Sequence, residues 1–172
     1  MVAPLRRRDL GPEEPMGHMT PQITAARATG ANSRDIWTWR NDPDTRAMSI
    51  STDEISWEEH SRWYRDILAD PNRYLYLGRL ADNGNVGICR FDVDTLKNVA
   101  HVSINLNPAM RGRNLSHVLL AAAIAAFWNE KNVSLLATIK QGNAASIRCF
   151  LKCGFELVAD DGEQTYYRLS TR

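Results

Sequence analysis

The sequence predicts an α/β domain built around a mixed β-sheet. Short β-type runs alternate with helical patterns along residues 22–172, and turn residues separate them. The predicted order is one strand, two helices, three strands, a helix, a strand, a helix and two strands. Apolar residues make up 44% of the 172-residue chain, which is enough to fill the core of one domain.

A strand, two helices and a hairpin are predicted in the first half of this domain. Ser33 is a suitable N-cap for the first helix, and Ser56 with Glu59 three residues later forms a capping box for the second. Each helix ends at a turn that contains proline, because the residue before a proline disfavours helical geometry. The predicted ranges are 23–28 for the strand, 33–41 and 56–70 for the helices, and 73–80 and 86–93 for the hairpin strands.

The second half begins with a strand that ends at an Asn-Pro pair and is followed by the strongest helix of the chain. That helix has apolar residues at i, i+3 and i+4 from Leu115 to Phe127. Gly154 suits the C-terminal cap of a further helix, and an Asp-Asp-Gly turn closes a final hairpin. The predicted ranges are 99–106, 135–139, 155–159 and 165–169 for the strands, and 115–127 and 143–152 for the helices.

Charge and composition argue against several classes of protein. The 21 Lys and Arg residues against 20 Asp and Glu give a net charge of +1, which argues against a nucleic-acid or polybasic membrane-surface partner. No run approaches the roughly 20 apolar residues that a membrane helix needs. Cys89, Cys149 and Cys153 lack the spacing of a disulfide framework or of a metal site. They indicate free thiols in a reducing compartment, and hence a cytoplasmic protein.

Residues 1–21 are predicted to form a flexible leader outside the domain. Four of the seven prolines fall there, and apolar periodicity is absent. The run of arginines at residues 6–8 resembles the start of a signal peptide, but no apolar stretch follows it. These arginines are therefore interpreted as solvated, and the working domain as residues 22–172.

Residues 106–120 have the pattern of an anion-binding turn. A strand ends at Leu106, a basic loop with Arg111 and Arg113 follows, and a helix then begins. Free backbone N–H groups at the positive end of a helix dipole bind phosphate, and the arginines add charge at the same place. The same residues also fit a basic loop that only covers the edge of the sheet, and residue chemistry alone leaves this alternative open.

Two blocks of residues resemble the GNAT superfamily of N-acetyltransferases. The segment from Arg111 to Ser116 is similar to the loop that binds the pyrophosphate of acetyl-CoA, whose pattern is Gln or Arg, two residues, Gly, one residue, Gly or Ala. The resemblance covers residues 22–172 and implies the GNAT fold, with a mostly antiparallel sheet of about seven strands flanked by four helices. The second block surrounds the last predicted helix and comprises Asn143, Ser146, Phe150, Lys152, Gly154 and Phe155.

The resemblance implies acetyl-CoA as co-substrate and direct transfer of its acetyl group to a primary amine. In the family, the strand before the loop diverges from its neighbour, and its free backbone N–H groups polarise the thioester. Here that strand is residues 99–106. The residues implied in binding CoA are Leu106, Asn107, Arg111, Gly112, Arg113, Asn114, Leu115, Ser116, Asn143, Ser146, Phe150 and Lys152.

Three of these residues depart from the family pattern. Asn114 and Ser116 replace small residues of the loop, but Asn tolerates unusual backbone angles and Ser is only slightly larger than Ala. Phe150 stands where many members have a tyrosine that protonates the CoA thiolate. A thiol of pKa ~8.5 lies ~1.5 units from protonation at pH 7, or about 2 kcal/mol, which the reaction tolerates. Ser146, Cys149 or a water can substitute for the tyrosine, and Phe150 itself fits core packing.

A general base is expected because the attacking amine must be neutral. A lysine-like amine is neutral in only about one molecule in 10³ at pH 7. Asp92 and Ser103, on strands that border the acceptor cleft, are the predicted catalytic residues and act through water. His101 shares a strand face with Ser103, but it also fits a surface position.

A more specific resemblance narrows the choice of acceptor substrate. The front half is most similar to the acetyltransferase group of pseudaminic acid biosynthesis, whose acceptor is a UDP-linked amino sugar. Arg40, His60 and Arg90 are then the predicted substrate-binding residues. The nearby tryptophans can stack on the nucleobase or, alternatively, can seat two helices on the sheet. The resembling stretches are residues 39–43, 55–63, 87–92 and 102–104.

Other functions remain open. Ribosomal-protein N-terminal alanine acetyltransferases and spermidine acetyltransferases are also similar, though less closely. A polyamine acceptor would use Glu54, Glu58 and Glu59, which equally suit a solvated helix start. The departures from the loop pattern motivate a third alternative, a GNAT-fold module that binds acyl-CoA without catalysis. A monomer or a homodimer is expected, because edge strands allow pairing but do not require it.

Overall fold

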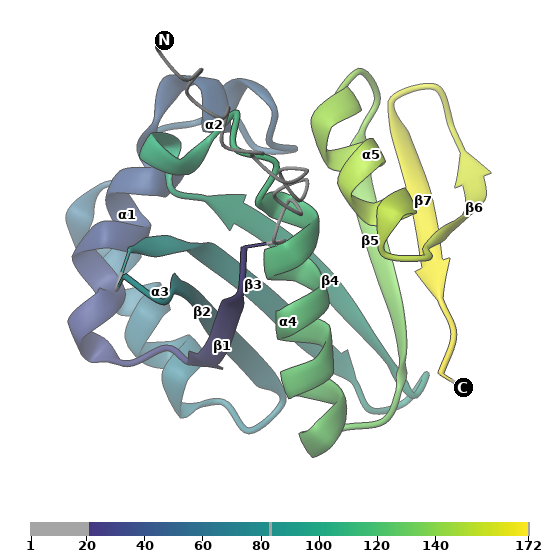
Figure 1. The fold of residues 1–172 in the computed structure, drawn as a ribbon, viewed down its shortest axis with the longest axis horizontal. Coiled ribbons are helices and arrows are strands. Elements are labelled where there is room, and N and C mark those ends of the chain that lie inside the picture. Colours follow the sequence, from purple (N-terminus) through teal and green to yellow (C-terminus); the bar gives the residue numbers. More distant parts are fainter. Residues whose placement is uncertain (1–20, 83, 172) are drawn as a thin grey trace, which may run out of the picture.

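The computed structural model describes residues 21–82 and 84–171, so the predicted leader, apart from residue 21, lies outside the described residues. The strands are β1 (Ile23–Arg27), β2 (Arg73–Leu80), β3 (Asn85–Asp94), β4 (Val99–Leu106), β5 (Ser134–Lys140), β6 (Glu156–Asp160) and β7 (Gln164–Leu169). The helices are α1 (Ser33–Asn41), α2 (Pro43–Ala47), α3 (Trp57–Ala69), α4 (Ser116–Glu130) and α5 (Ala144–Lys152), with 3₁₀ turns at Gly30–Asn32 and Pro108–Met110 (Figure 1).

The described strands form one sheet in the order β1-β2-β3-β4-β5-β7-β6. Neighbouring strands are antiparallel except β4 and β5, which run parallel. The prediction of a mixed, mostly antiparallel sheet of about seven strands is confirmed. β4 and β5 pair only between residues 99–101 and 134–136, and beyond these residues the two strands diverge (Figure 1).

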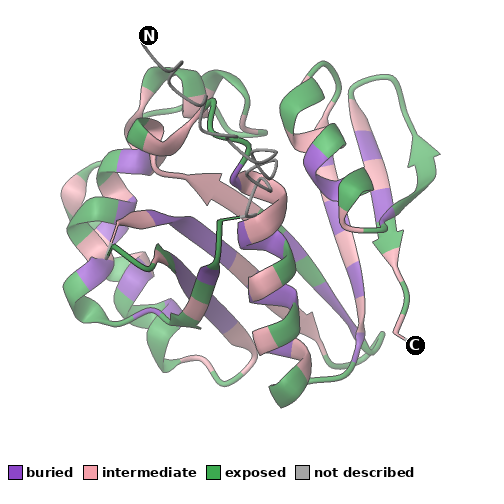
Figure 2. Cartoon of the chain, in the orientation of Figure 1, coloured by how far each residue is buried: buried purple, intermediate pink, exposed green. Residues whose placement is uncertain are grey.

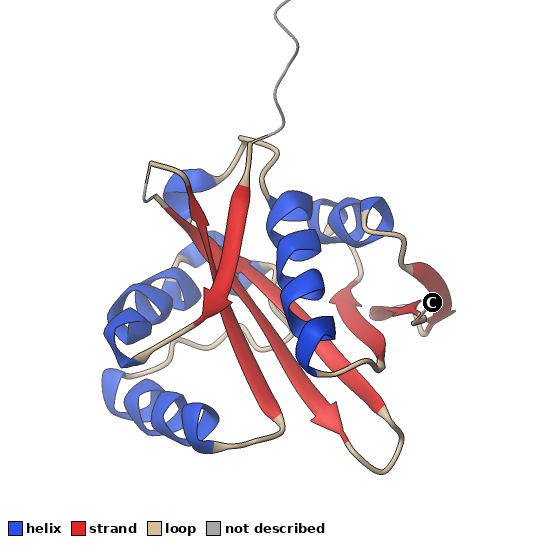
Figure 3. Ribbon diagram, turned by 60° about the horizontal axis from the view of Figure 1, so that its bottom comes forward, coloured by secondary structure: helices blue, strands red, loops and turns tan. Residues whose placement is uncertain are grey.

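Helices cover both faces of the sheet (Figure 3). On one face, α4 packs onto the central strands through Leu119, Leu120 and Phe127, all fully buried. On the other face, α1 and α3 place Trp39 and Tyr64 against β2 and β3. Figure 2 shows the buried positions along the sheet and α4, whereas β6 at the sheet edge is exposed throughout. No helix in the described part of the chain has the length and apolarity needed to span a bilayer.

The predicted strand boundaries agree with the structure to within one residue, because most elements carry local start and stop signals. The capping box is confirmed: Ser56 Oγ accepts from the Glu59 N–H at 3.2 Å, and the Glu59 carboxylate accepts from the Ser56 N–H at 3.0 Å. One detail differs at α1. Its N-cap is Asn32 rather than Ser33, since a 3₁₀ turn leads directly into the helix.

The predicted number of four helices needs a correction, because the described chain contains a fifth, short helix, α2. The Asn-Asp-Pro sequence does end α1, but Asp42 then caps a new helix by accepting a hydrogen bond from the Thr45 N–H at 3.0 Å. Pro43 occupies the first turn, where a missing N–H costs nothing. Residues of α2 line the site described next.

Candidate active site

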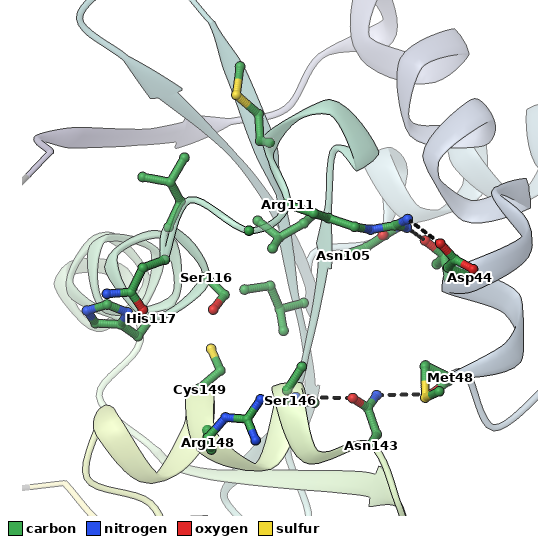
Figure 4. Close-up of a pocket in the computed structure, with 18 of the residues that line it drawn as sticks. Asp44, Met48, Asn105, Arg111, Ser116, His117, Asn143, Ser146, Arg148 and Cys149 are labelled. Atoms are coloured by element: carbon green, nitrogen blue, oxygen red, sulfur yellow. Dashed lines mark hydrogen bonds and ion pairs between the residues drawn. The ribbon is translucent and has the colours of Figure 1, made fainter.

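A groove of about 560 Å³ lies where the loop after β4 meets the starts of α4 and α5 (Figure 4). We call this groove the loop cavity. Its position agrees with the anion-binding turn predicted from the sequence. Nine of the twelve residues predicted to bind CoA line it: Leu106, Arg111, Gly112, Asn114, Leu115, Ser116, Asn143, Ser146 and Lys152.

The remaining three predicted residues lie elsewhere. Asn107 turns its side chain toward β3, where Nδ2 donates to a backbone carbonyl at 2.9 Å. Arg113 is exposed and lies against the sulfur of Met110. Phe150 is buried, with its ring centroid 4.9 Å from that of Phe155, and it borders a second cavity described below.

The loop backbone adopts left-handed angles at two positions. Gly112 has a φ of +73° and Asn114 a φ of +56°. Asparagine adopts this region more readily than most residues, so Asn114 holds a left-handed angle that glycine would otherwise supply. Its Oδ1 accepts a hydrogen bond from Lys152 Nζ at 3.2 Å. Leu115, the N-cap of α4, supplies no capping side chain, so N–H groups of the first turn are available to an anion.

The part of β4 that diverges from β5 directs two backbone N–H groups into the opening between these two strands. The Asn107 N–H donates to the Val86 carbonyl on β3 at 2.9 Å. Because N–H groups alternate sides along a strand, those of Ile104 and Leu106 point the other way, toward β5. β5 has already separated there, since its pairing with β4 stops at His101. These donors suit the stabilisation of negative charge on a thioester oxygen.

A second groove, also of about 560 Å³, lies on the sheet face that α1 and α3 cover. We call it the sheet cavity. It meets the loop cavity at Ile104 and Asn105 on one side of the opening and at Asn143 and Ser146 on the other, since these residues line both. The two cavities therefore meet where β4 and β5 diverge.

Cations outnumber anions in the sheet cavity. Among the described residues that line it, Arg40, Arg90 and Lys140 are positively charged, and Glu59 is the single carboxylate. The Glu59 carboxylate is already held by Ser56 in the capping box. All three predicted substrate-binding residues, including the histidine described below, line this cavity.

The two arginines of the sheet cavity are held differently. Nη2 of Arg40 donates to the Ser51 carbonyl at 2.9 Å, whereas its buried Nη1 has no hydrogen-bond partner among the described residues. Burial lowers the pKa of Arg40, and the positive charge of Arg46 lowers it further. The Arg90 guanidinium lies 5.9 Å from the centre of the Trp63 ring. Arg40 therefore contributes a positive charge to the cavity wall and has one buried nitrogen, Nη1, without a partner among the described residues.

His60 forms an uncharged part of the same wall. It is 2% exposed, and its ring stacks on those of Trp57 and Tyr64. Nε2 lies 2.9 Å from the Ser33 carbonyl oxygen, so Nε2 carries the proton and donates it. Burial lowers the pKa of His60, and the hydrogen bond to Ser33 opposes that shift.

The two predicted catalytic residues lie in different surroundings. Ser103 lines the sheet cavity and is opposite Arg90 in the pairing of β3 with β4. The carboxylate of Asp92 lies 3.0 Å from Arg90 Nε and 3.6 Å from Arg73 Nε, so two arginines engage it. His101 pairs with Asp92 and is exposed. Ser103 therefore lies in the cavity wall, whereas Asp92 is not among the lining residues and reaches the cavity only through its contact with Arg90.

Sequence reasoning misses the contribution of α2 and the residues after it. Thr45, Met48 and Ser49 line both cavities, and Asp44 lines the loop cavity. The sequence does contain a signal for this helix, because an Asp followed by a proline is a typical N-cap with proline at the first helical position. The same two residues also end α1, and the sequence interpretation assigns them only that role.

Two thiols lie near the loop cavity. Cys149 lines it, and Cys153 is the C-cap residue that follows the last residue of α5. A hydrogen bond from Cys153 lowers the pKa of the Cys149 thiol. Within residues 21–82 and 84–171, no group of three or more His, Cys, Asp or Glu side chains is placed to hold a metal ion.

Comparisons with known proteins agree with this architecture. A family model described as "Acetyltransferase (GNAT) domain" matches residues 26–156. The spermidine N-acetyltransferase from Vibrio cholerae, in complex with CoA and spermine, superposes with a TM-score of 0.75 at 16% identity and covers 86% of this chain and 93% of its own. The aminoglycoside acetyltransferase AAC(6')-Ib, in complex with coenzyme A, superposes with a TM-score of 0.73 at 19% identity and covers 88% and 95%.

These comparisons are less informative about the acceptor substrate than about the fold. No curated protein sequence matches the chain. Identities of 16% and 19% show a shared fold and nothing finer. The two solved structures are named for polyamine and aminoglycoside substrates, so they give no support to the expected pseudaminic acid group.

Proposed function

The chain belongs to the GNAT acetyltransferase family, whose members take the acetyl group from acetyl-CoA, and we propose that it transfers this group to the primary amine of a small, negatively charged acceptor. A nucleotide-linked amino sugar has this chemistry. The observation that carries the proposal is the meeting of the two cavities at Ile104 and Asn105, where β4 and β5 diverge.

The loop cavity is the proposed site of acetyl-CoA. The backbone N–H groups from Gly112 to Ser116 lie at the positive end of the α4 dipole, where a diphosphate binds favourably. The pantetheine arm is proposed to pass between Leu106 and Asn143, which both line the loop cavity. This route brings the thioester to the N–H groups of the diverging part of β4, which stabilise charge on its oxygen.

The proposed reaction is direct attack of the amine on the thioester carbon. The N–C bond forms, the C–S bond breaks, CoA leaves as a thiolate, and the attacking amine loses a proton. Ser103 and, through water, Asp92 are the proposed route for that proton. Phe150 has no proton to donate to the thiolate, so we propose that the Ser146 hydroxyl, which lines both cavities, donates a hydrogen bond to the thiolate and relays a proton from water, with the Cys149 thiol as the alternative donor.

Charge in the sheet cavity favours one class of acceptor. Arg40, Arg90 and Lys140 attract phosphate or carboxylate groups and repel a polycation, and the Asp92 carboxylate 3.0 Å from Arg90 Nε offsets part of the Arg90 charge. Of the three glutamates expected to serve a polyamine, only Glu59 lines the cavity, and Ser56 already holds it. The cavity therefore favours an anionic amine over the polyamine alternative.

A single assay separates these possibilities. Release of CoA thiol is measured with acetyl-CoA and a panel comprising a UDP-linked amino sugar, spermidine, kanamycin and a peptide with a free N-terminal alanine. The highest kcat/KM for the amino sugar supports the proposal, and a higher value for spermidine overturns the acceptor class. Calorimetry with acetyl-CoA is the companion measurement. Binding without turnover on any acceptor would indicate a non-catalytic module, and failure to bind would overturn the donor assignment.

A further inference from the structure

Residues 42–49, which comprise α2 and its flanking residues, lie at the junction of the two cavities. We call this segment the strap. Thr45, Met48 and Ser49 line both cavities, so the position of the strap affects the space available to either substrate. It is attached at both sides of the opening between β4 and β5. One attachment is an ion pair with carboxylates of the strap, and the other is a pair of hydrogen bonds to its backbone carbonyls.

The attachment on the loop side is made by Arg111. Its Nη2 lies 2.5 Å from Asp42 Oδ1 and 2.5 Å from Thr45 Oγ1. Its Nη1 lies 3.4 Å from Asp44 Oδ2, and Figure 4 shows Arg111 pointing toward Asp44. Asp42 Oδ1 also accepts the capping hydrogen bond of α2, so one carboxylate both starts the helix and holds the arginine. The side chains of Arg111 and Asp42 are only 32% and 22% exposed. The ion pair is therefore partly shielded from water, where such contacts are stronger.

The attachment on the opposite side is made by neutral acceptors of the strap backbone. Lys140 Nζ donates to the Ala47 carbonyl at 3.0 Å, and Asn143 Nδ2 donates to the Met48 carbonyl at 3.1 Å. Asn143 Oδ1 in turn accepts from the Ser146 N–H at 3.1 Å and caps α5. The strap thus links the loop after β4 to the end of β5 and the start of α5.

We propose that Arg111 is a positioning residue, whose guanidinium holds the strap across the opening while backbone N–H groups of the loop bind the CoA diphosphate. The inference rests on the proposed function, because it takes the loop cavity as the CoA site. A guanidinium has five N–H donors, and three contacts to the strap already use both of its terminal nitrogens. Arg111 thereby connects the loop after β4 to strap residues that also line the sheet cavity.

Two substitutions test this role. Arg111→Gln removes the guanidinium, and Asp42→Ser removes the carboxylate but keeps an N-cap acceptor for α2. If Arg111 acts through the strap, both changes loosen the same contact, and the double variant adds little to either one. We expect each to raise amide hydrogen exchange in residues 43–49 about fivefold and to weaken CoA binding by about three- to tenfold, as for a partly exposed charged contact.

The opposite result is equally specific. If Arg111 is a direct ligand of the diphosphate, Asp42→Ser releases it, so CoA binding stays the same or tightens while Arg111→Gln alone weakens it. Additive effects in the double variant would also overturn the proposal. Arg113→Gln makes the same charge change on the same loop and should leave exchange in residues 43–49 unchanged.

Calorimetry with CoA and hydrogen exchange on the full chain provide the two readouts. If the unsubstituted chain fails to bind CoA, the proposed function itself is wrong. If it binds CoA but Asp42→Ser and Arg111→Gln behave differently, only the role of the strap is wrong.

Discussion

The two cavities of this acetyltransferase are built in different ways. The anion-binding groups that we propose for the loop cavity belong to the backbone of one contiguous stretch, where Gly112 and Asn114 adopt left-handed angles and α4 begins without a capping side chain. Backbone groups survive most substitutions, whereas side-chain groups do not. We therefore expect single substitutions to change the use of the acceptor more readily than the binding of the donor. The sheet cavity takes its groups from side chains on four separate elements, namely Arg40, His60, Arg90 and Lys140.

The largest expected effect comes from the arginines of the sheet cavity. Arg40→Gln or Arg90→Gln removes a charged donor, and a hydrogen bond to a charged group is worth about 1.5–3 kcal/mol. We expect kcat/KM for a UDP-linked amino sugar to fall about 10- to 100-fold, with the Kd for CoA within about twofold of its original value. Thiol-release kinetics and calorimetry measure the two quantities.

Arg65→Gln is the matched control for these variants, since Arg65 is exposed on α3 and is not part of the sheet cavity lining. A loss of CoA affinity as large as the loss of kcat/KM would contradict the separation of the two cavities. A gain of spermidine turnover in Arg90→Gln would support the separation further, because a cavity with one cation fewer repels a polyamine less strongly.

Gly87 tests whether the loop cavity also depends on the position of β4. A Cβ at this residue would lie 2.4 Å from the Asn105 carbonyl oxygen and 2.8 Å from the Leu106 Cα. Gly87→Ala must therefore displace β4, and overpacking of this kind costs about 1–3 kcal/mol. We expect Tm to fall by roughly 2–10 °C. We also expect the Kd for CoA to rise by up to about tenfold, the equivalent of about 1.4 kcal/mol.

Gly30→Ala is the control, because a Cβ there meets nothing within 4 Å. Differential scanning calorimetry and CoA titration on both variants provide the comparison. A destabilised Gly87→Ala chain that still binds CoA normally would show that the loop builds the donor site without help from β4.

Much of the fold and of the loop cavity could be predicted because their signals are local in the sequence. The capping box at Ser56 and the apolar spacing of α4 each lie within a few turns of helix. The backbone angles of the loop follow from the residues at 112 and 114 themselves. The effect of an asparagine in place of the family's glycine can therefore be inferred from the residue type alone.

The sheet cavity could be predicted only in part, because it depends on strand register and on contacts between distant residues. Ser103 faces Arg90 through the pairing of β3 with β4, and Arg73 on β2 reaches the carboxylate of Asp92. The sequence indicates that these residues are on strands but not which arginines engage the carboxylate. The contact between Arg111 and the strap joins residues 69 positions apart in the chain, and no local pattern contains it.

His60 gives a smaller effect, on the pH dependence of stability. Burial lowers its pKa, so the folded chain binds this proton less well than the unfolded chain. Below about pH 6.5, the ordinary histidine value, the unfolded state therefore binds more protons, and the free energy of unfolding falls as the pH falls. The contribution is fully present above that pH and is lost as the pH drops toward the lowered pKa.

His60→Gln isolates this contribution, because glutamine retains a donor for the Ser33 carbonyl but does not titrate. Urea unfolding between pH 5 and pH 7.5 should show a steeper acid loss of stability in the unsubstituted chain than in the variant. Parallel pH curves would mean that the burial of His60 has no consequence for folding.

The smallest expected effect is that of Asn114→Gly in the loop cavity. Glycine keeps the left-handed angle and loses only the exposed contact with Lys152, which is worth a few tenths of a kcal/mol. We expect the Kd for CoA to stay within about twofold. Asn114→Ala, which forces a left-handed alanine at a cost of about 1 kcal/mol, should weaken CoA binding about fivefold. If Asn114→Gly instead weakens binding as much as Asn114→Ala, the asparagine side chain supplies the affinity, and the loop cavity is built from side chains as the sheet cavity is.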